Sequence, residues 1–199
     1  KKNLNKWRIK QSSSVKKKTK INKMSKPSIG IIGGGQLGSM LSTAAKNLNL
    51  KTVILSDDKD SPAQFFADEF ILCKYNDEFK IEEFSNKIDF VTYEFENIPY
   101  ETLCKIDNIK KINPKPSINK IIQNRLSEKD FLNKININTT SYISIKNEKE
   151  LKSSQDLIPG ILKTCTLGYD GKGQYKINNE KELDSLKVNF EKHYILEKL

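Results

Sequence analysis

Short apolar runs alternate with amphipathic stretches over residues 28–113, and this alternation limits the folds open to the chain. The runs predicted to be strands are 28–32, 51–55, 69–73, 88–93 and 110–113. The helices expected between them are 36–50, 77–87 and 99–106. In the second of these helices Phe79, Ile81 and Phe84 are expected to face inward. Alternating strands and helices predict a Rossmann-like α/β domain, with a parallel sheet and helices on both faces.

Pro114 and Pro116 are expected to form a stiff junction, after which the pattern changes. A helix is predicted at 117–134, and the later elements are shorter. The strands expected there are 141–145, 159–163, 174–177 and 194–199, and the helices are 148–152 and 180–186. We therefore expect a basic tail at 1–26, a first domain at 27–116 and part of a second α+β domain at 117–199. The chain stops inside its last predicted strand, so the rest of that domain is expected beyond it.

Gly33-x-Gly35-x-x-Gly38 lies between the first predicted strand and the first helix. This spacing matches the dinucleotide fingerprint, and Asp57 follows the second strand near the expected distance. An NAD-dependent oxidoreductase is therefore one hypothesis. The motif alone is weak, because glycines next to a helix N-terminus form a pocket for any phosphate.

The segment from Lys163 to Gln174 reads Lys-Thr-Cys-Thr-Leu-Gly-Tyr-Asp-Gly-Lys-Gly-Gln. Glycines allow close approach of the backbone to an anion, and Lys163 and Lys172 can neutralise phosphate charge. It is not a Walker loop, because Gly-x4-Gly-Lys-Ser/Thr is absent. A phosphate-binding loop is the first hypothesis, and the alternative is a polar hairpin turned at Asp170-Gly171.

Three further polar positions are candidates for binding. Glu94 follows the fourth predicted strand, at the sheet edge where open α/β sheets bind ligands. Arg125 and Lys129 lie one helical turn apart and share a face, for which the alternative is an exposed charged helix. Glu197 can accept from a ribose hydroxyl or an exocyclic amine, although an edge-strand charge is the default interpretation.

The net charge of +10 belongs to the N-terminal tail and not to the folded body. Residues 1–26 hold eleven of the 35 Lys and Arg residues and no Asp or Glu, which leaves 24 basic and 25 acidic side chains elsewhere. The tail is too polar to order itself, and Met24 is a candidate start of the functional protein. No basic face for nucleic acid follows from this distribution.

Cysteine and histidine usage argues against metal and disulfide chemistry. Cys73, Cys104 and Cys165 are isolated, so a reducing, cytoplasmic compartment is expected. His193 has no second histidine with which to share a metal ion, and no nucleophile with a basic partner is evident. No apolar stretch approaches the roughly 20 residues of a membrane span.

Taken together, these motifs resemble the ATP-grasp superfamily, and most closely its N5-carboxyaminoimidazole ribonucleotide synthetases. The segments that carry the resemblance are 31–41, 92–97, 125–129 and 162–174. Their order and spacing agree with that family from about Lys26 to the end of the chain. The resemblance implies a homodimeric ligase that uses ATP and Mg²⁺, with aminoimidazole ribonucleotide and bicarbonate as substrates. Another ATP-grasp ligase and a non-catalytic fragment stay open as alternatives.

The resemblance also implies roles for individual residues. Lys172 is expected to be catalytic. Gly35, Gln36 and Leu37 are expected to help hold the phosphate of the ribonucleotide, and Glu94 is expected to contact the same substrate. Those expected to bind ATP are Arg125, Lys163, Gly168, Tyr169, Asp170, Gly171, Lys172, Gly173, Gln174, Glu197, Lys198 and Leu199. Magnesium ligands are expected beyond residue 199, so the fragment alone should not turn over. Ser39 stands where many relatives have a basic residue.

The implied reaction has two steps. ATP activates bicarbonate as carboxyphosphate, and the exocyclic amine of the ribonucleotide then captures the carboxyl group or CO₂ released from it. Charge neutralisation by Lys163 and exclusion of water by the loop around Lys172 would contribute more than covalent catalysis.

Overall fold

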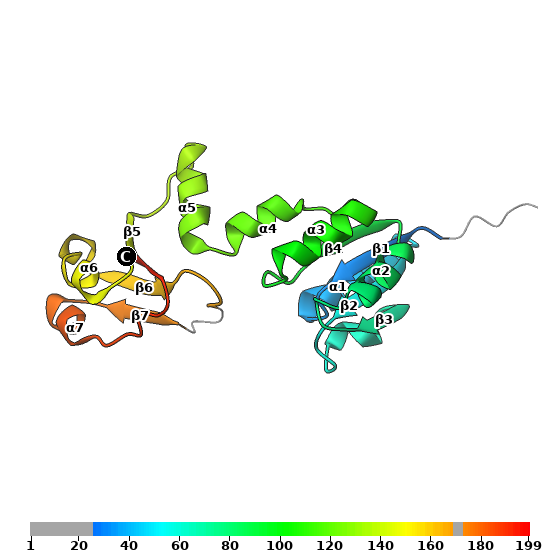
Figure 1. Ribbon diagram of the computed structural model, residues 1–199, viewed down its shortest axis with the longest axis horizontal. Coiled ribbons are helices and arrows are strands. Elements are labelled where there is room, and N and C mark those ends of the chain that lie inside the picture. Colours follow the sequence, from blue (N-terminus) through cyan, green and yellow to red (C-terminus); the bar gives the residue numbers. More distant parts are fainter. Residues whose placement is uncertain (1–25, 169–172) are drawn as a thin grey trace, which may run out of the picture.

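The computed structural model describes residues 26–168 and 173–199, and these residues form two sheets. Each sheet has its own hydrophobic core. Figure 1 shows the two sheets with helices α4 and α5 in the chain between them.

The first sheet is parallel, in the order β3-β2-β1-β4, as the sequence predicted. Its strands are β1 (Ser28–Ile32), β2 (Lys51–Ser56), β3 (Glu69–Leu72) and β4 (Phe90–Tyr93). Residues 110–113, predicted as a further strand, make only an isolated bridge from Ile112 to Val91. Pro114 and Pro116 follow at once, and proline cannot donate a ladder hydrogen bond, so the pairing ends there.

Helices cover both faces of this sheet, as predicted. The elements are α1 (Gln36–Asn47), the 3₁₀ turn η1 (Pro62–Phe65), α2 (Glu78–Asn86) and α3 (Tyr100–Ile109). Ile81, Phe84 and Leu103 join the larger core, while Ile31 and Ile54 pack with Ala63 of η1 on the other face. Strands buried on both faces are typical of parallel sheets.

Some apolar residues of α1 and α2 are exposed instead. Phe79 of α2 is 75% exposed, so its expected inner position is wrong. On α1 the buried residues are Gly38, Ser42 and Ala45, which let the helix approach the sheet closely. The large apolar side chains of this helix and of its C-cap are exposed: Leu37, Met40, Leu41 and Leu48.

The helix predicted at 117–134 is divided into α4 (Pro116–Ile122) and α5 (Arg125–Lys134). Asn124 is extended between them, and its Oδ1 accepts from the backbone N–H groups of Leu126 and Ser127. This is an N-cap, which satisfies donors that a helix start leaves unpaired. Local capping by one asparagine therefore overrides the continuous helical pattern.

The second sheet is antiparallel, in the order β5-β8-β6-β7. Its strands are β5 (Tyr142–Ile145), β6 (Gly160–Thr164), β7 (Gln174–Ile177) and β8 (Tyr194–Lys198). Its helices are α6 (Glu148–Lys152) and α7 (Glu180–Ser185), with the 3₁₀ turn η2 (Gln155–Leu157) after α6. Leu151 of α6 and Leu183 of α7 pack on one face with Leu162 and Leu196.

The same four residues, Asn-Glu-Lys-Glu, form the N-cap and first turn of α6 and α7, at 147–150 and 179–182. In each case the asparagine Oδ1 accepts from the N–H of the fourth residue, at 2.9 and 3.0 Å. The fourth residue, Glu150 or Glu182, returns a carboxylate to the residue before the asparagine. Reciprocal capping of this kind sustains two short helices that propensity alone would leave marginal.

Candidate functional site

The glycine turn after β1 encloses a carboxylate of the chain itself. Glu94, directly after β4, accepts from the Gly35 N–H through Oε1 at 2.9 Å. A Cβ placed on Gly33, Gly35 or Gly38 would lie within 3.4 Å of that same oxygen. Gly33 also has φ +106°, which disfavours any side chain. The anion position at the N-terminus of α1 is therefore filled by Glu94.

A cavity of about 240 Å³ opens beside this turn, at the carboxyl ends of β1, β2 and β4. Its lining residues are Gly33, Gly34, Gly35, Ser56, Asp57, Asp58, Ser61, Tyr75, Glu94 and Phe95. Two of the residues predicted to bind the ribonucleotide, Gly35 and Glu94, lie in this lining. Gln36 and Leu37 are exposed and are not part of it.

The chemistry of this cavity favours a ligand that donates hydrogen bonds. It contains three carboxyl side chains, Asp57, Asp58 and Glu94. Burial raises the pKa of the Tyr75 hydroxyl, which keeps this side chain neutral. A dinucleotide pyrophosphate at the glycine turn would displace or oppose the Glu94 carboxylate. The geometry thus argues against the NAD hypothesis, although the fingerprint spacing is present.

The second candidate site lies on the face of the antiparallel sheet opposite α6 and α7. Lys163 Nζ on β6 lies 2.8 Å from Glu197 Oε2 on β8, and Lys129 Nζ on α5 lies 3.6 Å from Glu197 Oε1. The three side chains are 11–22% exposed. We call them the Lys-Glu-Lys cluster. Two ammonium groups against one carboxylate leave it with an excess positive charge, which suits a polyanion.

Lys129 is not among the predicted site residues, although it shares a helix face with Arg125 and lies in the segment 125–129 that carries the resemblance. Its ammonium group also lies 5.5 Å from the centre of the Tyr142 ring, in cation–π geometry. The Tyr142 hydroxyl in turn donates to Asp130 Oδ1 at 2.7 Å. Lys129 is therefore held in place, and it is not part of a solvated charged surface. Its spacing to Arg125 was the available sequence signal.

Arg125 lies at the start of α5 and binds the end of β6. Its backbone N–H donates to Cys165 O at 2.9 Å, and Nη1 donates to Thr164 O at 2.8 Å. Nη2 donates to Gly168 O. Arg125 and Lys163 thus lie at the same end of the second sheet, as their predicted shared role requires.

The predicted phosphate loop is described only at its two ends. Gly168 is bound to Arg125 as above, and Gly173, with φ +71°, accepts from Thr164 N–H at 3.0 Å. Gln174 begins β7 opposite Lys163. Tyr169, Asp170, Gly171 and Lys172 lie outside the described residues, and with them the predicted catalytic lysine.

Glu197 and Lys198, which are expected to bind ATP, lie at the end of β8, and Leu199 follows directly. The Lys198 N–H donates to Ser141 O and the Leu199 N–H donates to Pro159 O, at 2.9 and 3.0 Å. The Lys198 carbonyl accepts from the Thr140 hydroxyl at 2.7 Å. Both backbone N–H groups already donate within the protein. A nucleotide base placed here would therefore have to bond with backbone carbonyl groups.

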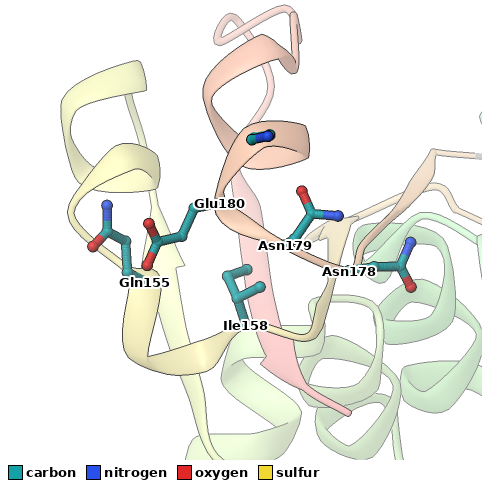
Figure 2. Close-up of a pocket in the computed structure, with 6 residues that line it drawn as sticks. Gln155, Ile158, Asn178, Asn179 and Glu180 are labelled. Atoms are coloured by element: carbon teal, nitrogen blue, oxygen red, sulfur yellow. The ribbon is translucent and has the colours of Figure 1, made fainter.

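A larger cavity, of about 630 Å³, lies on the helical side of the second sheet. Figure 2 shows its lining around Ile158, with the side chains of Gln155, Asn178, Asn179 and Glu180. Asn178 and Asn179 of this lining bond with Glu182, so their polar groups serve the start of α7. The cavity lies on the opposite face from the Lys-Glu-Lys cluster.

Neither metal nor thiol chemistry is evident in the part of the chain that the structure describes. Over residues 26–168 and 173–199, no three His, Cys, Asp or Glu side chains are grouped to hold a metal ion. Burial raises the pKa of Cys73 to about 11 and also raises that of Cys165, so both thiols stay protonated. His193 Nε2 pairs with Ser144 Oγ at 2.7 Å. Among the same residues, no helix combines the length and apolarity that a membrane span needs.

Two family models match the chain. Residues 24–123 match the ribonucleotide synthetase preATP-grasp domain, and residues 130–199 match the ATP-grasp domain. N5-carboxyaminoimidazole ribonucleotide synthases from Staphylococcus aureus and Staphylococcus haemolyticus are each 40% identical to it. The alignments cover 78% and 80% of this chain but 42% and 43% of the relatives. The chain therefore spans less than half the length of these curated relatives.

Solved structures agree with this result. The Staphylococcus aureus N5-carboxyaminoimidazole synthetase complexed with ADP matches 87% of this chain and 47% of its own, with a TM-score of 0.76 and 34% identity. The Aspergillus clavatus synthase in complex with ADP and 5-aminoimidazole ribonucleotide matches with a TM-score of 0.73 at 25% identity, over 87% of this chain and 46% of its own. The resemblance inferred from the motifs is confirmed. Because the first family model covers half of its residues, the chain belongs to the ribonucleotide synthetase preATP-grasp family, and an ATP-grasp domain follows in the same chain.

Proposed function

We propose that the complete protein catalyses the ATP-dependent carboxylation of 5-aminoimidazole ribonucleotide with bicarbonate. The products are N5-carboxyaminoimidazole ribonucleotide, ADP and phosphate, and the step belongs to purine biosynthesis in the cytoplasm. The observation that carries the proposal is the pairing of two sites in one chain. An acidic cavity that prefers hydrogen-bond donors accompanies a cationic cluster that suits a polyphosphate.

Glu94 is proposed to select the ribonucleotide through its amine or ribose hydroxyls. Its Oε1 is held by Gly35 N–H, which fixes the carboxylate at the mouth of the cavity. A fixed acceptor costs little reorganisation when an N–H or O–H group arrives. The resemblance implies that the glycine loop holds the ribonucleotide phosphate, but the carboxylates of Asp57 and Asp58 make the cavity beside Gly35 a poor place for it. We therefore propose that groups outside this lining hold the phosphate.

Lys163 and Arg125 are proposed to neutralise the phosphates of ATP. Lys163 is held by Glu197 in this structure, so a phosphate oxygen would replace or share that partner. The exchange of one anion for another keeps the ammonium group paired throughout, and pairing offsets the cost of burying charge. In the reaction the γ-phosphoryl group passes to bicarbonate, and the amine then attacks the carboxyl carbon with loss of phosphate. Lys172 and residues 168–174 are proposed to act on that phosphoryl group.

Magnesium and a second copy of the chain complete the proposal. Mg²⁺ would supply charge neutralisation at the triphosphate, and over residues 26–168 and 173–199 no grouping of side chains fits it. The homodimer is supported by the exposed apolar stripe of α1, because Leu37 and Met40 are 56% and 60% exposed. The proposed domain division stays at residues 116 and 117.

The decisive assay is ADP release by the full-length protein. Release should require both bicarbonate and aminoimidazole ribonucleotide, and omission of either should abolish it. Turnover with a peptide or another acceptor in place of the ribonucleotide would contradict the proposed substrate while keeping the ATP-grasp chemistry. Reduction of nicotinamide cofactor would contradict the whole assignment.

A further inference from the structure

The turn that ends α4 holds the segment that follows Glu94. The side-chain amide of Gln123 donates to Glu96 O at 2.7 Å and to Ile98 O at 2.6 Å. Asn119, one turn earlier and fully buried, also donates to Ile98 O, at 3.4 Å. Both amide hydrogens of Gln123 are therefore used on the backbone of residues 96–98. Ile98 is itself fully buried in the larger core, which anchors this segment.

The residues immediately after Gln123 hold the opposite site. Asn124 caps α5, and Arg125 then binds the carbonyl groups of Thr164, Cys165 and Gly168. Only Asn124 separates Gln123, which binds the segment after Glu94, from Arg125, which binds the end of β6. Glu96 and Thr164 are far apart in sequence, so this short segment connects two distant parts of the chain.

The geometry points to Gln123 as a positioning residue that fixes the position of the ribonucleotide pocket relative to the nucleotide site. This inference rests on the proposed function, because it assumes that Glu94 contacts the ribonucleotide and Arg125 the ATP phosphates. Gln123 belongs neither to the lining of the cavity beside Glu94 nor to the Lys-Glu-Lys cluster. It acts by fixing the backbone at 96–98, two residues from Glu94, relative to Arg125.

Such a link has a thermodynamic consequence. If filling one pocket orders the 96–125 connection, the second ligand finds it already ordered and binds more tightly. The same factor must then appear in both directions, because coupling free energies are reciprocal. Loss of the two hydrogen bonds should weaken the coupling more than it weakens either ligand alone.

The test uses the full-length protein and the variant Gln123→Met, which keeps the side-chain length and removes both donors. We expect KM for aminoimidazole ribonucleotide to rise about tenfold, consistent with two neutral hydrogen bonds, while the Kd for ADP alone changes less than about twofold. Titration calorimetry of ADP with and without the ribonucleotide gives the coupling ratio. This ratio should exceed one in the wild type and approach one in Gln123→Met.

Two further variants separate positioning from a general loss of structure. Gln123→Lys keeps a donor for the two carbonyls and should restore most of the coupling. Gln64→Met is the matched control, since Gln64 donates to a loop carbonyl, Lys59 O at 3.2 Å, outside the link. If Gln123→Met melts below the assay temperature, Gln123→Glu offers a length-matched replacement for the same titration.

The outcomes are distinct. A coupling ratio of one in the wild type, or an unchanged ratio in Gln123→Met, overturns the inference while leaving the proposed function in place. An equal loss in Gln123→Lys and Gln123→Met also overturns it, because donor chemistry would then be irrelevant. Failure of the wild-type protein to release ADP with both substrates overturns the proposed function itself.

Discussion

The two candidate sites each centre on a carboxylate, and the contrast between them lies in what holds it. Glu94, in the parallel unit, is held by one uncharged backbone N–H of the glycine turn. Glu197, in the antiparallel unit, is held by the ammonium groups of Lys163 and Lys129. Glu94 is therefore met by the partial positive charge of a helix N-terminus, whereas Glu197 is met by two full positive charges.

The difference follows from the two kinds of sheet. A parallel sheet buried on both faces has only its strand ends free for polar groups, so its site lies at the carboxyl edge. The antiparallel sheet packs α6 and α7 on one face, so its opposite face can present Lys163 and Glu197 from adjacent strands. One chain thus builds a site that favours donors and a site that favours anions.

The largest expected effect is the loss of the cation at the antiparallel site. Lys163→Ala should lower kcat/KM for ATP by about 100-fold or more, because a phosphate loses a charged partner in a partly desolvated site. Lys176→Ala is the matched control, because Lys176 is exposed on neighbouring β7. The activity of this variant should stay within about twofold of the wild type. Equal losses in the two variants would contradict a specific role for Lys163. The measurement is the ADP-release assay with ATP varied.

The next effect tests the carboxylate of Glu94 at the glycine turn. Glu94→Gln keeps an oxygen that can accept from Gly35 N–H, but it removes the negative charge. KM for the ribonucleotide should rise about tenfold or more, while the Kd for ADP, measured by calorimetry, should not change. The control is Glu96→Gln, because Glu96 is exposed and lies two residues after Glu94. A change in ADP binding without a change in ribonucleotide KM would reverse the proposed division of labour.

A smaller effect is expected from Lys129, which holds Glu197 together with Lys163. Lys129→Met should weaken ADP binding about fivefold and leave adenosine binding unchanged, since the lost charge acts on phosphate. Lys134→Met, at the exposed end of the same helix, should have no effect. Coupling between Lys129→Met and Glu197→Gln, obtained from a double-mutant cycle, should be nonzero. Additive effects would show that the two side chains act independently.

The smallest effect concerns stability in acid. The hydrogen bonds of Ser28 to Asp89 and of Thr52 to Asp68 hold the pKa of both carboxyl groups below the usual 3.8. A lowered pKa in the folded state stabilises the protein above pH 3.8, and this contribution is lost as the pH falls through the folded value.

Melting temperatures between pH 5 and pH 2 would check this expectation. The wild type should lose stability with a steeper slope than Asp89→Asn, which no longer titrates at that position. Asp60→Asn, in an exposed loop, should follow the wild type. Parallel slopes for all three proteins would mean that the Ser28–Asp89 contact does not contribute.

Much of the fold was predictable because periodicity reports burial directly. The four strands of the first sheet and the four of the second were predicted within a residue or two of their observed bounds. The errors arose where a local or tertiary contact outweighed the pattern. Asn124 capped a new helix inside a predicted one, Phe79 lay exposed on α2, and residues 110–113 formed only a single bridge.

The candidate sites were predictable to a lesser degree. Glu94, Arg125, Lys163 and Glu197 were named from sequence, and the structure gives each of them polar partners. The contact between Glu94 and Gly35 could not be predicted, because it joins the ends of two strands far apart in sequence. Gln123 gave no signal, since an amide at a helix end is ordinary until its acceptors are known.

The glycine turn has a consequence for how such chains are recognised. A methyl group on Gly38 would lie 2.7 Å from the carbonyl oxygen of Gly33, and one on Gly34 would strike the Ser61 side chain at 2.4 Å. These clashes arise between parts of the protein, with no bound molecule involved. A motif search that infers a redox coenzyme from this glycine spacing is therefore detecting tight backbone packing. The side chain that lies in the turn, here Glu94, decides which ligand can bind.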